Sequence, residues 1–474
     1  MSYSAAIDQL NAMAPELYSH PGQPRRKFSL DEVRILLAAL GDPHRHFRSV
    51  LIAGTNGKGS TAATLASILI VSGLRAGLYT SPHLERVNER IRIDHAEIAD
   101  DIFARLYFRV HDAAQQLVQQ GRLPQHPSFF EILTAIAFLC FAEANIDLAV
   151  LEVGMGGRLD ATNVVDPLLS IITDISLDHT EWLGSTIAAI AREKAGILRP
   201  GGRMIRLPQC TEADDVMNEI ARELGVRWLD ASSYIPPQIE QANQDKELGA
   251  PSIPRFFKEK MRNGWETTEA GPYPVNVLDS SIEVVSPLSG AHQHRNIALA
   301  IAAAVELARD YGFHITPHQI AEGIRLTQWP GRLEHIVRGG ISWILDVAHN
   351  PAGAWAVRSA LSCVPRGGSA KTLIFSCLRD KPIVEMVRIL FPLFERVILT
   401  PLHAARAASI EDLTAAARLT QTPFLVAESV ADALLLASKH AGGNPIIVCG
   451  SVYLVGEARS LLLAEGAESG GRIS

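Results

Sequence analysis

The sequence predicts an α/β protein of two domains. The chain has 474 residues, which is more than one ordinary domain contains. Short apolar strand patterns alternate with helical patterns along most of its length, as is typical of parallel sheets. The first strongly apolar run, residues 49–53, leads directly into a glycine-rich turn that holds one lysine. These observations together predict parallel strands joined by helices.

Composition bounds the class of protein and its partners. Hydrophobic residues make up 47% of the chain and charged residues 20%, as in globular proteins, and the formal net charge is −7. An acidic chain gives no broad attraction to nucleic acid. No signal-peptide pattern opens the sequence, and its longest apolar run, residues 132–142, is too short to span a membrane. We therefore expect a cytoplasmic protein without nucleic acid or membrane partners.

The five cysteines are scattered without any CxxC spacing. An odd number at wide spacing predicts buried thiols in a reducing compartment. Their positions are Cys140, Cys210, Cys363, Cys377 and Cys449.

The glycine-rich turn is predicted to cradle phosphate. A strand ends at Ala53 and a helix begins near Lys58, so an anion there would meet backbone amides, a helix N-terminus and an ammonium group. The turn departs from the general P-loop pattern, because Ile52 takes the place of its first glycine and Gly59 that of the hydroxyl residue after the lysine. Part of a metal shell must then come from elsewhere. An ordinary glycine turn between strand and helix is the alternative.

The rest of the first half alternates between helix and strand patterns. An amphipathic pattern in residues 1–47 predicts a helical cap, and helices are expected at 64–72, 98–119 and 130–143. Apolar strands are expected at 76–80, 148–153 and 168–174. The last two carry Glu152 and Asp174 at their carboxyl ends. In open parallel sheets these ends border the ligand crevice, so the two acids and the cradle predict a magnesium–nucleotide site.

The second half contains a change of composition and then a second domain. Residues 228–286 are rich in proline, glutamine and asparagine, which predicts irregular surface structure or a small strand pair without chemistry. Helices are expected at 293–311 and 317–327. Strands at 341–345, 372–375, 396–399 and 446–448 alternate with helices afterwards. We predict an N-terminal domain over 1–327 with a P-loop-type parallel sheet flanked by helices, a hinge at 328–332, and a smaller Rossmann-like α/β domain over 333–474.

Several motifs, taken in order, resemble one enzyme family. They include Gly54-Thr55-Asn56-Gly57-Lys58-Gly59-Ser60, Thr80-Ser81-Pro82-His83-Leu84, Leu151-Glu152-Val153-Gly154-Met155-Gly156-Gly157-Arg158-Leu159-Asp160, Leu177-Asp178-His179-Thr180, Arg192-Glu193-Lys194-Ala195-Gly196, Gly331-Arg332, Asp346-Val347-Ala348-His349-Asn350-Pro351 and Gly450-Ser451-Val452-Tyr453. Over about residues 25–460 the chain resembles the folylpolyglutamate synthase/dihydrofolate synthase family of the Mur ligase superfamily. The match is looser at residues 376–382, which contain the pair Asp380-Lys381, and at 292–296.

The resemblance implies an ATP-dependent amide ligase of folate biosynthesis and one-carbon metabolism. A carboxylate of dihydropteroate or of a reduced folate would attack the γ-phosphate of ATP, and the resulting acyl phosphate would be captured by the amine of L-glutamate. Dihydrofolate or folylpolyglutamate would form, with release of ADP and phosphate. Such chemistry depends on positioning and charge neutralisation more than on a protein nucleophile. A monomer is expected.

The resemblance also implies roles for particular residues. Those expected to bind ATP are Thr55, Asn56, Gly57, Lys58, Gly59, Ser60, Asn296, Arg332, Asp346 and His349. Two Mg²⁺ ions are expected, one on Ser81 and Glu152 and a second on Glu152 and His179. Lys194 resembles the family's carbamoylated lysine, whose anionic oxygens suit a hard cation. The catalytic set would be Lys58, Glu152, His179 and Lys194.

The resemblance places the pterin-bearing substrate on three segments. They are Ser29-Leu30-Asp31, Ser128-Phe129-Phe130-Glu131 and Leu159-Asp160-Ala161. An aromatic wall can stack on a flat ring, and a carboxylate can accept hydrogen bonds from its amino edge. By pattern alone, however, Phe129 and Phe130 fit a core equally well, His179 fits a polar loop and Lys194 fits a solvated helix face.

Two other functions stay open on the sequence. One is a cell-wall-type Mur ligase acting on a nucleotide-linked peptide, which the short stretch of about 50 residues before the cradle disfavours. The other is a regulatory protein that binds and hydrolyses nucleotide without ligation.

Overall fold

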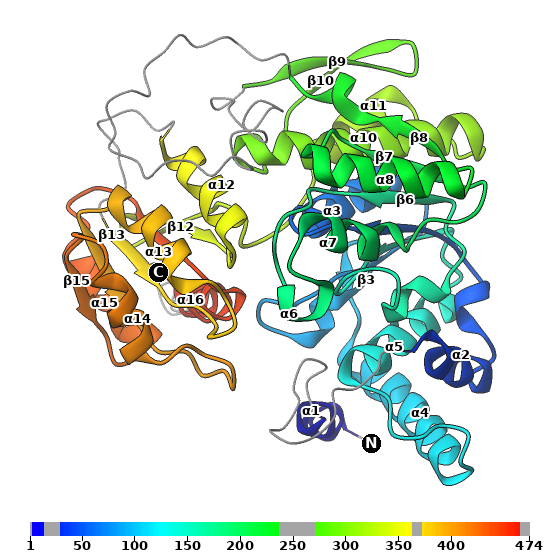
Figure 1. The fold of residues 1–474 in the computed structure, drawn as a ribbon, viewed down its shortest axis with the longest axis horizontal. Coiled ribbons are helices and arrows are strands. Elements are labelled where there is room, and N and C mark those ends of the chain that lie inside the picture. The colour runs from blue at the N-terminus through cyan, green and yellow to red at the C-terminus, as the bar shows by residue number, and fades with distance from the viewer. Residues whose placement is uncertain (1, 14–28, 237–270, 363–371, 465–474) are drawn as a thin grey trace, which may run out of the picture.

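The computed structural model describes residues 2–13, 29–236, 271–362 and 372–464. They form two α/β domains, which lie side by side in Figure 1. The N-terminal domain is built on a sheet of eight strands. In spatial order these are β4 (Ala96–Glu97), β3 (Ile91–Ile93), β2 (Ala76–Tyr79), β5 (Leu148–Glu152), β1 (Arg48–Ala53), β6 (Leu169–Ile172), β7 (Arg203–Arg206) and β8 (Arg227–Asp230).

This sheet is parallel from β2 to β8, as predicted, and gains an antiparallel edge from β3 and β4. Its central strands are apolar on both faces, because helices cover both sides. Along β1, Leu51 and Ala53 face one core while Val50 and Ile52 face the other. The alternation follows from the two-residue period of a strand. The continuous apolar runs in the sequence are thus central strands of a covered sheet.

Two groups of helices cover the sheet. On one side lie α1 (Tyr3–Ala12), α2 (Leu30–Ala39), α4 (Asp100–Gln119), α5 (Phe129–Glu143), α7 (Ile187–Ala195) and α8 (Thr211–Glu223). On the other lie α3 (Lys58–Val71), α10 (Ala291–Asp310) and α11 (Pro317–Arg325), with the hairpin of β9 (Tyr273–Val277) and β10 (Ser280–Val284) against them. The hairpin confirms the strand pair expected within 228–286, although residues 237–270 lie outside the described part.

The C-terminal domain has a six-stranded sheet. Its order is β11 (Glu334–Arg338), β12 (Ile341–Asp346), β16 (Ile446–Cys449), β13 (Thr372–Phe375), β14 (Arg396–Leu399) and β15 (Phe424–Val426). Only β11 is antiparallel to its neighbour, and the last strand in the sequence, β16, occupies the middle of the sheet. The helices α12 (Pro351–Ser362), α13 (Ile383–Leu390) and α14 (Ile410–Ala417) cover one face, and α15 (Val430–Lys439) and α16 (Val452–Ala464) cover the other.

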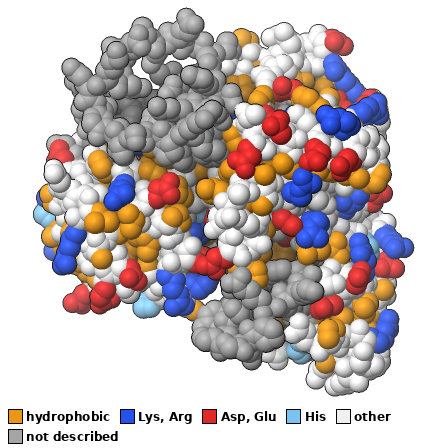
Figure 2. Space-filling view, in the orientation of Figure 1, with side chains coloured by type: hydrophobic (Ala, Val, Ile, Leu, Met, Phe, Trp, Pro, Cys, Tyr) orange, Lys and Arg blue, Asp and Glu red, His pale blue; other side chains and the backbone are white. Residues whose placement is uncertain are grey.

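The distribution of surface charge and the burial of the cysteines agree with the composition of the chain. On the face drawn in Figure 2, acidic and basic side chains are interspersed rather than gathered into one basic patch. The four described cysteines, Cys140, Cys210, Cys377 and Cys449, are buried and form no disulfide with one another, whereas Cys363 lies outside the described residues. None of the helices among the described residues combines the length and apolar content needed to cross a membrane.

Candidate active site

The glycine-rich turn joins β1 to α3, as the sequence predicts. Gly57 precedes the helix with φ 91°, a left-handed conformation that favours glycine. A Cβ at Gly57 would lie 2.1 Å from Oδ1 of Asn296, and a Cβ at Gly59 would lie 2.7 Å from the indole of Trp329. Asn296 therefore packs on the turn from α10, and Trp329 packs on the first turn of α3. The absence of a hydroxyl side chain at position 59 has a steric reason, since the tryptophan occupies that space.

Two lysines meet at one carbonyl of the turn. Nζ of Lys58 donates to the carbonyl oxygen of Gly54 at 3.0 Å, and Nζ of Lys194 donates to the same oxygen at 2.8 Å. Lys194 is 3% exposed, so it does not lie on a solvated helix face. Burial, and then the charge of Lys58, lower the pKa of Lys194 to about 7. A substantial fraction of Lys194 is therefore neutral near pH 7.

Glu152 ends β5 beside the loop that follows β2. Its Oε2 accepts a hydrogen bond from the backbone amide of Ser81 at 3.2 Å, so these two predicted metal ligands are neighbours. Glu152 is buried, and burial raises its pKa while the charge of Lys58 opposes the rise. The buried carboxyl group of Glu152, with Lys58 and Ser81 as neighbours, offers oxygen donors of the kind that a hard cation prefers.

The loop after β6 carries His179, which has a left-handed backbone at φ 50°. Burial lowers its pKa to about 4, so the imidazole is neutral at pH 7 and can act as a ligand. Asp174, at the start of this loop, already takes part in an ion pair. Its Oδ1 accepts a hydrogen bond from Nη2 of Arg295 at 2.7 Å, and the two side chains form a buried ion pair. Asp174 thus stands at the rim of the sheet, as predicted, with its charge paired with Arg295.

Among the described residues, no three His, Cys, Asp or Glu side chains gather into a metal site. The predicted magnesium donors would have to include the hydroxyl of Ser81 and a modified Lys194.

A pocket between the domains collects most of the residues expected to bind ATP. Asn56, Gly57, Ser60 and Asn296 line it from the N-terminal domain, and Arg332, Asp346 and His349 from the hinge and the C-terminal domain. Arg332 and Asp346 are opposite charges that act on each other. Burial lowers the pKa of Arg332 and raises that of Asp346, and in each case the charge of the other residue opposes the change. His292 also lines this pocket, and burial lowers its pKa to about 4. Sequence reasoning assigned it no role.

The segments expected to bind the pterin have clear structural roles. Ser128 and Glu131 form a capping box at the start of α5. Phe130 is buried, with its ring 5.8 Å from that of Tyr79, whereas Phe129 is half-buried beneath the guanidinium of Arg90 at 5.2 Å. Phe130 therefore belongs to the core, and Phe129 keeps an accessible face.

Asp160 organises the glycine-rich loop after β5. Its two oxygens accept hydrogen bonds from the amides of Gly154, Met155 and Thr162 and from the Thr162 hydroxyl. Leu159 and Ala161 flank it, and Ala161 begins the short 3₁₀ helix that α2 packs against.

The third expected segment lies at the start of α2. Ser29 caps the helix, Leu30 is its first residue, and Asp31 is exposed and pairs with Arg34 at 3.0 Å.

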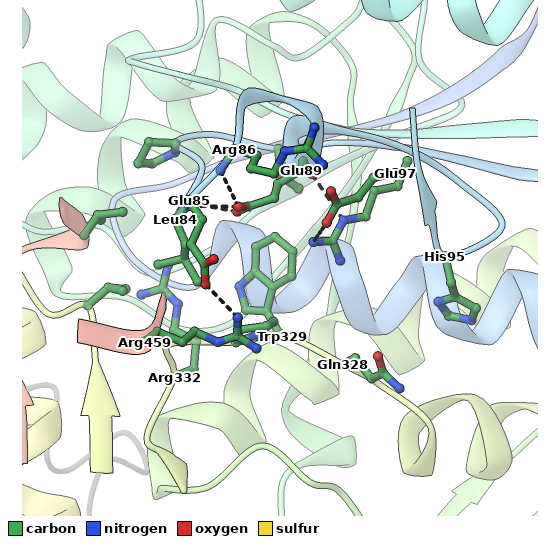
Figure 3. A pocket seen from close by; sticks show the side chains of 16 residues that line it. Leu84, Glu85, Arg86, Glu89, His95, Glu97, Gln328, Trp329, Arg332 and Arg459 are labelled. Carbon is green, nitrogen blue, oxygen red and sulfur yellow. Dashed lines mark hydrogen bonds and ion pairs between the residues drawn. The ribbon is translucent and has the colours of Figure 1, made fainter. Parts of the chain in front are cut away.

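A second pocket, of about 330 Å³, opens at the hinge (Figure 3). Trp329 and Arg332 line it from the hinge, and Arg86 lines it from the segment after β2. Arg92 adds a third arginine from β3. From the C-terminal domain, Arg459 reaches across and pairs with Glu85 at 2.8 Å. Because Arg332 borders this pocket and the nucleotide pocket, the two spaces adjoin.

Comparisons with known proteins agree with this geometry. Residues 52–304 match the family model of the Mur ligase middle domain, and residues 331–452 match the Mur ligase, glutamate ligase domain. The chain is 34% identical to the folylpolyglutamate synthase of Lacticaseibacillus casei over 443 residues, covering 93% of this chain and 96% of that protein. It is 32% identical to the dihydrofolate synthase/folylpolyglutamate synthase of Bacillus subtilis, covering 92% and 95%. This chain belongs to the folylpolyglutamate synthase/dihydrofolate synthase family of Mur ligases.

Solved structures show the same fold in this family. The Mycobacterium tuberculosis folylpolyglutamate synthase complexed with ADP aligns with a TM-score of 0.82 at 30% identity, covering 97% of this chain and 99% of that one. Escherichia coli FolC in complex with DHPP and ADP aligns with a TM-score of 0.78 at 27% identity, covering 98% and 99%. The two-domain α/β prediction is confirmed.

Several residues that connect the site were missed. Asp178, Asn350 and Lys381 join the two domains beside the phosphate loop, and Arg295 neutralises Asp174. Asp178 and Asn350 lie inside motifs, next to His179 and His349, and the Asp380-Lys381 pair was visible. Only the fold, however, shows that these segments meet.

Proposed function

We propose that this protein is an ATP-dependent amide ligase that joins L-glutamate to dihydropteroate, to the γ-carboxylate of a reduced folate, or to both. The observation that carries the proposal is the interdomain nucleotide pocket, whose lining combines the phosphate cradle with Asn296, Arg332, Asp346 and His349. The family membership of the chain supports the same reaction. A carboxylate oxygen attacks the γ-phosphorus of ATP and ADP leaves. The glutamate amine then attacks the acyl carbon, phosphate leaves, and the amine loses a proton.

The chain's own residues supply positive charge and orientation. Lys58 lies at the cradle beside Glu152, and Arg332 reaches the same region from the hinge. Arg332 presents a planar fork of donors that suits phosphate oxygens. Fixed charges aimed at the transferring phosphoryl group stabilise it without reorganisation.

Mg²⁺ is proposed at this site on two sets of donors. Ser81 and Glu152 would hold one ion, and Glu152 with His179 a second, with Lys194 completing the shell as a carbamate. Bound magnesium would neutralise charge on the β- and γ-phosphates. The neutral His179 and the buried carboxylate of Glu152 fit this role.

Carbamoylation of Lys194 is supported by the crowding of two lysines. An amine attacks carbon dioxide only when it is neutral, and the pKa of about 7 provides that form. The reaction joins the nitrogen to the carbon of CO₂ and releases one proton. The product is an anion beside Lys58, so a repulsive pair of ammonium groups becomes an attractive pair.

Substrate carboxylates are proposed to approach through the hinge pocket. Arg86, Arg92 and Arg332 surround it, and the adjoining Arg332 leads to the nucleotide pocket. The accessible face of Phe129, with Asp160 and the loop that it holds, is proposed to contact the pterin. Ser29, Leu30, Asp31, Ser128, Glu131, Leu159 and Ala161 then support that surface, chiefly by capping and positioning helices.

The test is ADP release with magnesium-ATP and L-glutamate, run in parallel with dihydropteroate and with tetrahydrofolate, and with products identified by mass. Turnover that needs both the pterin substrate and glutamate supports ligation. ADP release that needs neither would instead identify a nucleotide-hydrolysing regulatory protein. Turnover with both pterins would make the enzyme bifunctional.

A further inference from the structure

A buried ion pair ties the two domains together beside the phosphate loop. Nζ of Lys381, in the segment between β13 and α13, donates to Oδ1 of Asp178 at 2.7 Å. The two side chains are 6% and 9% exposed. Other titratable groups near Asp178 include His179 from its own loop and His349, whose Nε2 lies 3.9 Å from Oδ2, and Asp178 also raises the pKa of Lys58 and of Lys194 against the effect of burial. The pair belongs to neither proposed magnesium set.

A buried amide extends this contact to the cradle. Nδ2 of Asn350, which immediately precedes α12, donates to Oδ2 of Asp178 at 2.9 Å and to Oδ1 of Asn56 at 3.0 Å. Its own Oδ1 accepts the backbone amide of Gly353 at 2.8 Å, so the side chain is fixed to the C-terminal domain. Asn350 is 1% exposed. The Asn350 side chain therefore contacts both the phosphate loop, at Asn56, and the loop that carries Asp178.

The Asp178 loop is in turn attached to the phosphate loop. The amide of Thr55 donates to the carbonyl oxygen of Asp174 at 2.8 Å, and the Thr55 hydroxyl donates to that of Ser176 at 3.0 Å. The Ser176 amide returns a bond to the Thr55 hydroxyl at 3.1 Å. These bonds lie within the N-terminal domain, so the phosphate loop is held even without the other domain. Lys381 adds the link to the C-terminal domain.

A buried lysine–carboxylate pair adds little net stability, because the cost of desolvating both charges offsets their attraction, but its geometry is specific. We propose that Lys381 is a positioning residue for ligation: through Asp178 and Asn350 it docks the C-terminal domain onto the phosphate loop in the arrangement that the reaction requires. This inference rests on the proposed ligase function. It predicts that nucleotide binding survives loss of Lys381, whereas the chemical step does not.

The experiment compares Lys381→Met, Lys381→Arg and the double variant Asp178→Asn/Lys381→Met with the native protein. Lys439→Met is the matched control, since Lys439 is exposed at the end of α15 in the same domain. The measured quantities are kcat and KM for ATP from ADP release, the Kd for ATP by calorimetry, and the thermal midpoint. Lys381→Met should lower kcat about 100-fold and raise the Kd for ATP by no more than about tenfold, because the phosphate loop keeps its contacts while the C-terminal part of the pocket is displaced, so that the loss falls mainly on the chemical step. Lys381→Arg should recover kcat to within about tenfold.

The double variant separates positioning from stability. It removes both charges, so its thermal midpoint should return to the native value while kcat stays about 100-fold low. Recovery of kcat together with the midpoint would mean that the pair serves stability alone and would overturn the inference. So would native kcat in Lys381→Met.

Failure of the proposed function is distinguishable from failure of this inference. If the native protein binds ATP but forms no amide product, the ligase proposal fails. The docking role is then tested by small-angle scattering with saturating ATP, where Lys381→Met should show a larger radius of gyration than the native protein and Lys439→Met should not. Equal radii for all three proteins would overturn it.

Discussion

Because Trp329 packs on Gly59, we expect a glycine-to-alanine substitution there to change the stability of the protein in the opposite direction from the usual one. Replacing a glycine in the first turn of a helix with alanine normally stabilises the helix by about 1 kcal/mol. Here the added Cβ would lie 2.7 Å from Cζ2 and 3.1 Å from Cε2 of Trp329. An indole cannot yield as a flexible side-chain tip can, and overpacking of this kind costs about 1 to 3 kcal/mol. We therefore expect Gly59→Ala to destabilise the protein.

The cost less the gain gives a net loss of up to about 2 kcal/mol, which lowers the thermal midpoint by up to about 6 °C. The same displacement moves amides of the phosphate cradle, so KM for ATP should rise about tenfold, or about 1.4 kcal/mol. Calorimetry and ADP release measure the two quantities. The control is a double-mutant cycle with Trp329→Ala, which removes the obstructing ring.

In the Trp329→Ala background, Gly59→Ala should be neutral or stabilising by up to about 1 kcal/mol. An equal loss in both backgrounds would refute the steric reasoning, and so would an unchanged midpoint and KM in Gly59→Ala alone.

Three further predictions test the site. Lys194→Met should lower kcat for ligation at least about 10³-fold, because the carbamate cannot form, and normal activity would contradict the carbamate. The thermal midpoint should stay unchanged or rise, because a buried polar side chain gives way to an apolar chain of similar length. Burial lowers the pKa of His292 to about 4, so the folded protein holds this imidazole neutral while the unfolded chain protonates it, and the free energy of unfolding falls as pH drops from 6.5 to 4. His292→Gln removes this effect. Relative to the native protein, the variant should gain about 1 to 2 kcal/mol in free energy of unfolding at pH 4.5 compared with pH 7.5, measured by urea denaturation. Closure about residues 328–331 should require ATP, and scattering profiles that do not change with nucleotide and folate would count against a hinge.

The sequence predicted the phosphate loop and its neighbouring strands because those signals are local. A β-branched run, a glycine turn and a lysine are consecutive, and β1, β2, β5 and α3 formed where they were expected. The antiparallel edge of β3 and β4 was missed because these strands have only three and two residues. A pattern that short carries no clear period.

Short sequence patterns did not predict contacts between segments that are far apart in the chain. Asp174 and Arg295 are separated by 121 positions, and Asp178 and Lys381 by 203. The strand pattern correctly placed Asp174 at the rim of the sheet, but it could not reveal that an arginine from α10 neutralises that charge. Lys194 likewise fits a solvated face by helical period, and only the fold shows that it lies under the turn at Gly54.

The central place of β16 in the C-terminal sheet has a consequence for synthesis. Residues 446–449 pair with β12 on one side and β13 on the other. Until the ribosome has released them, the strands already made can form only two separate groups, β11 with β12 and β13 with β14 and β15. The N-terminal sheet, in contrast, has all its strands by residue 230. The helices α10 and α11 that cover its second face end at Arg325, so the nascent chain should complete its nucleotide cradle early and remain without a docking partner until β16 ends at Cys449, more than 100 residues later.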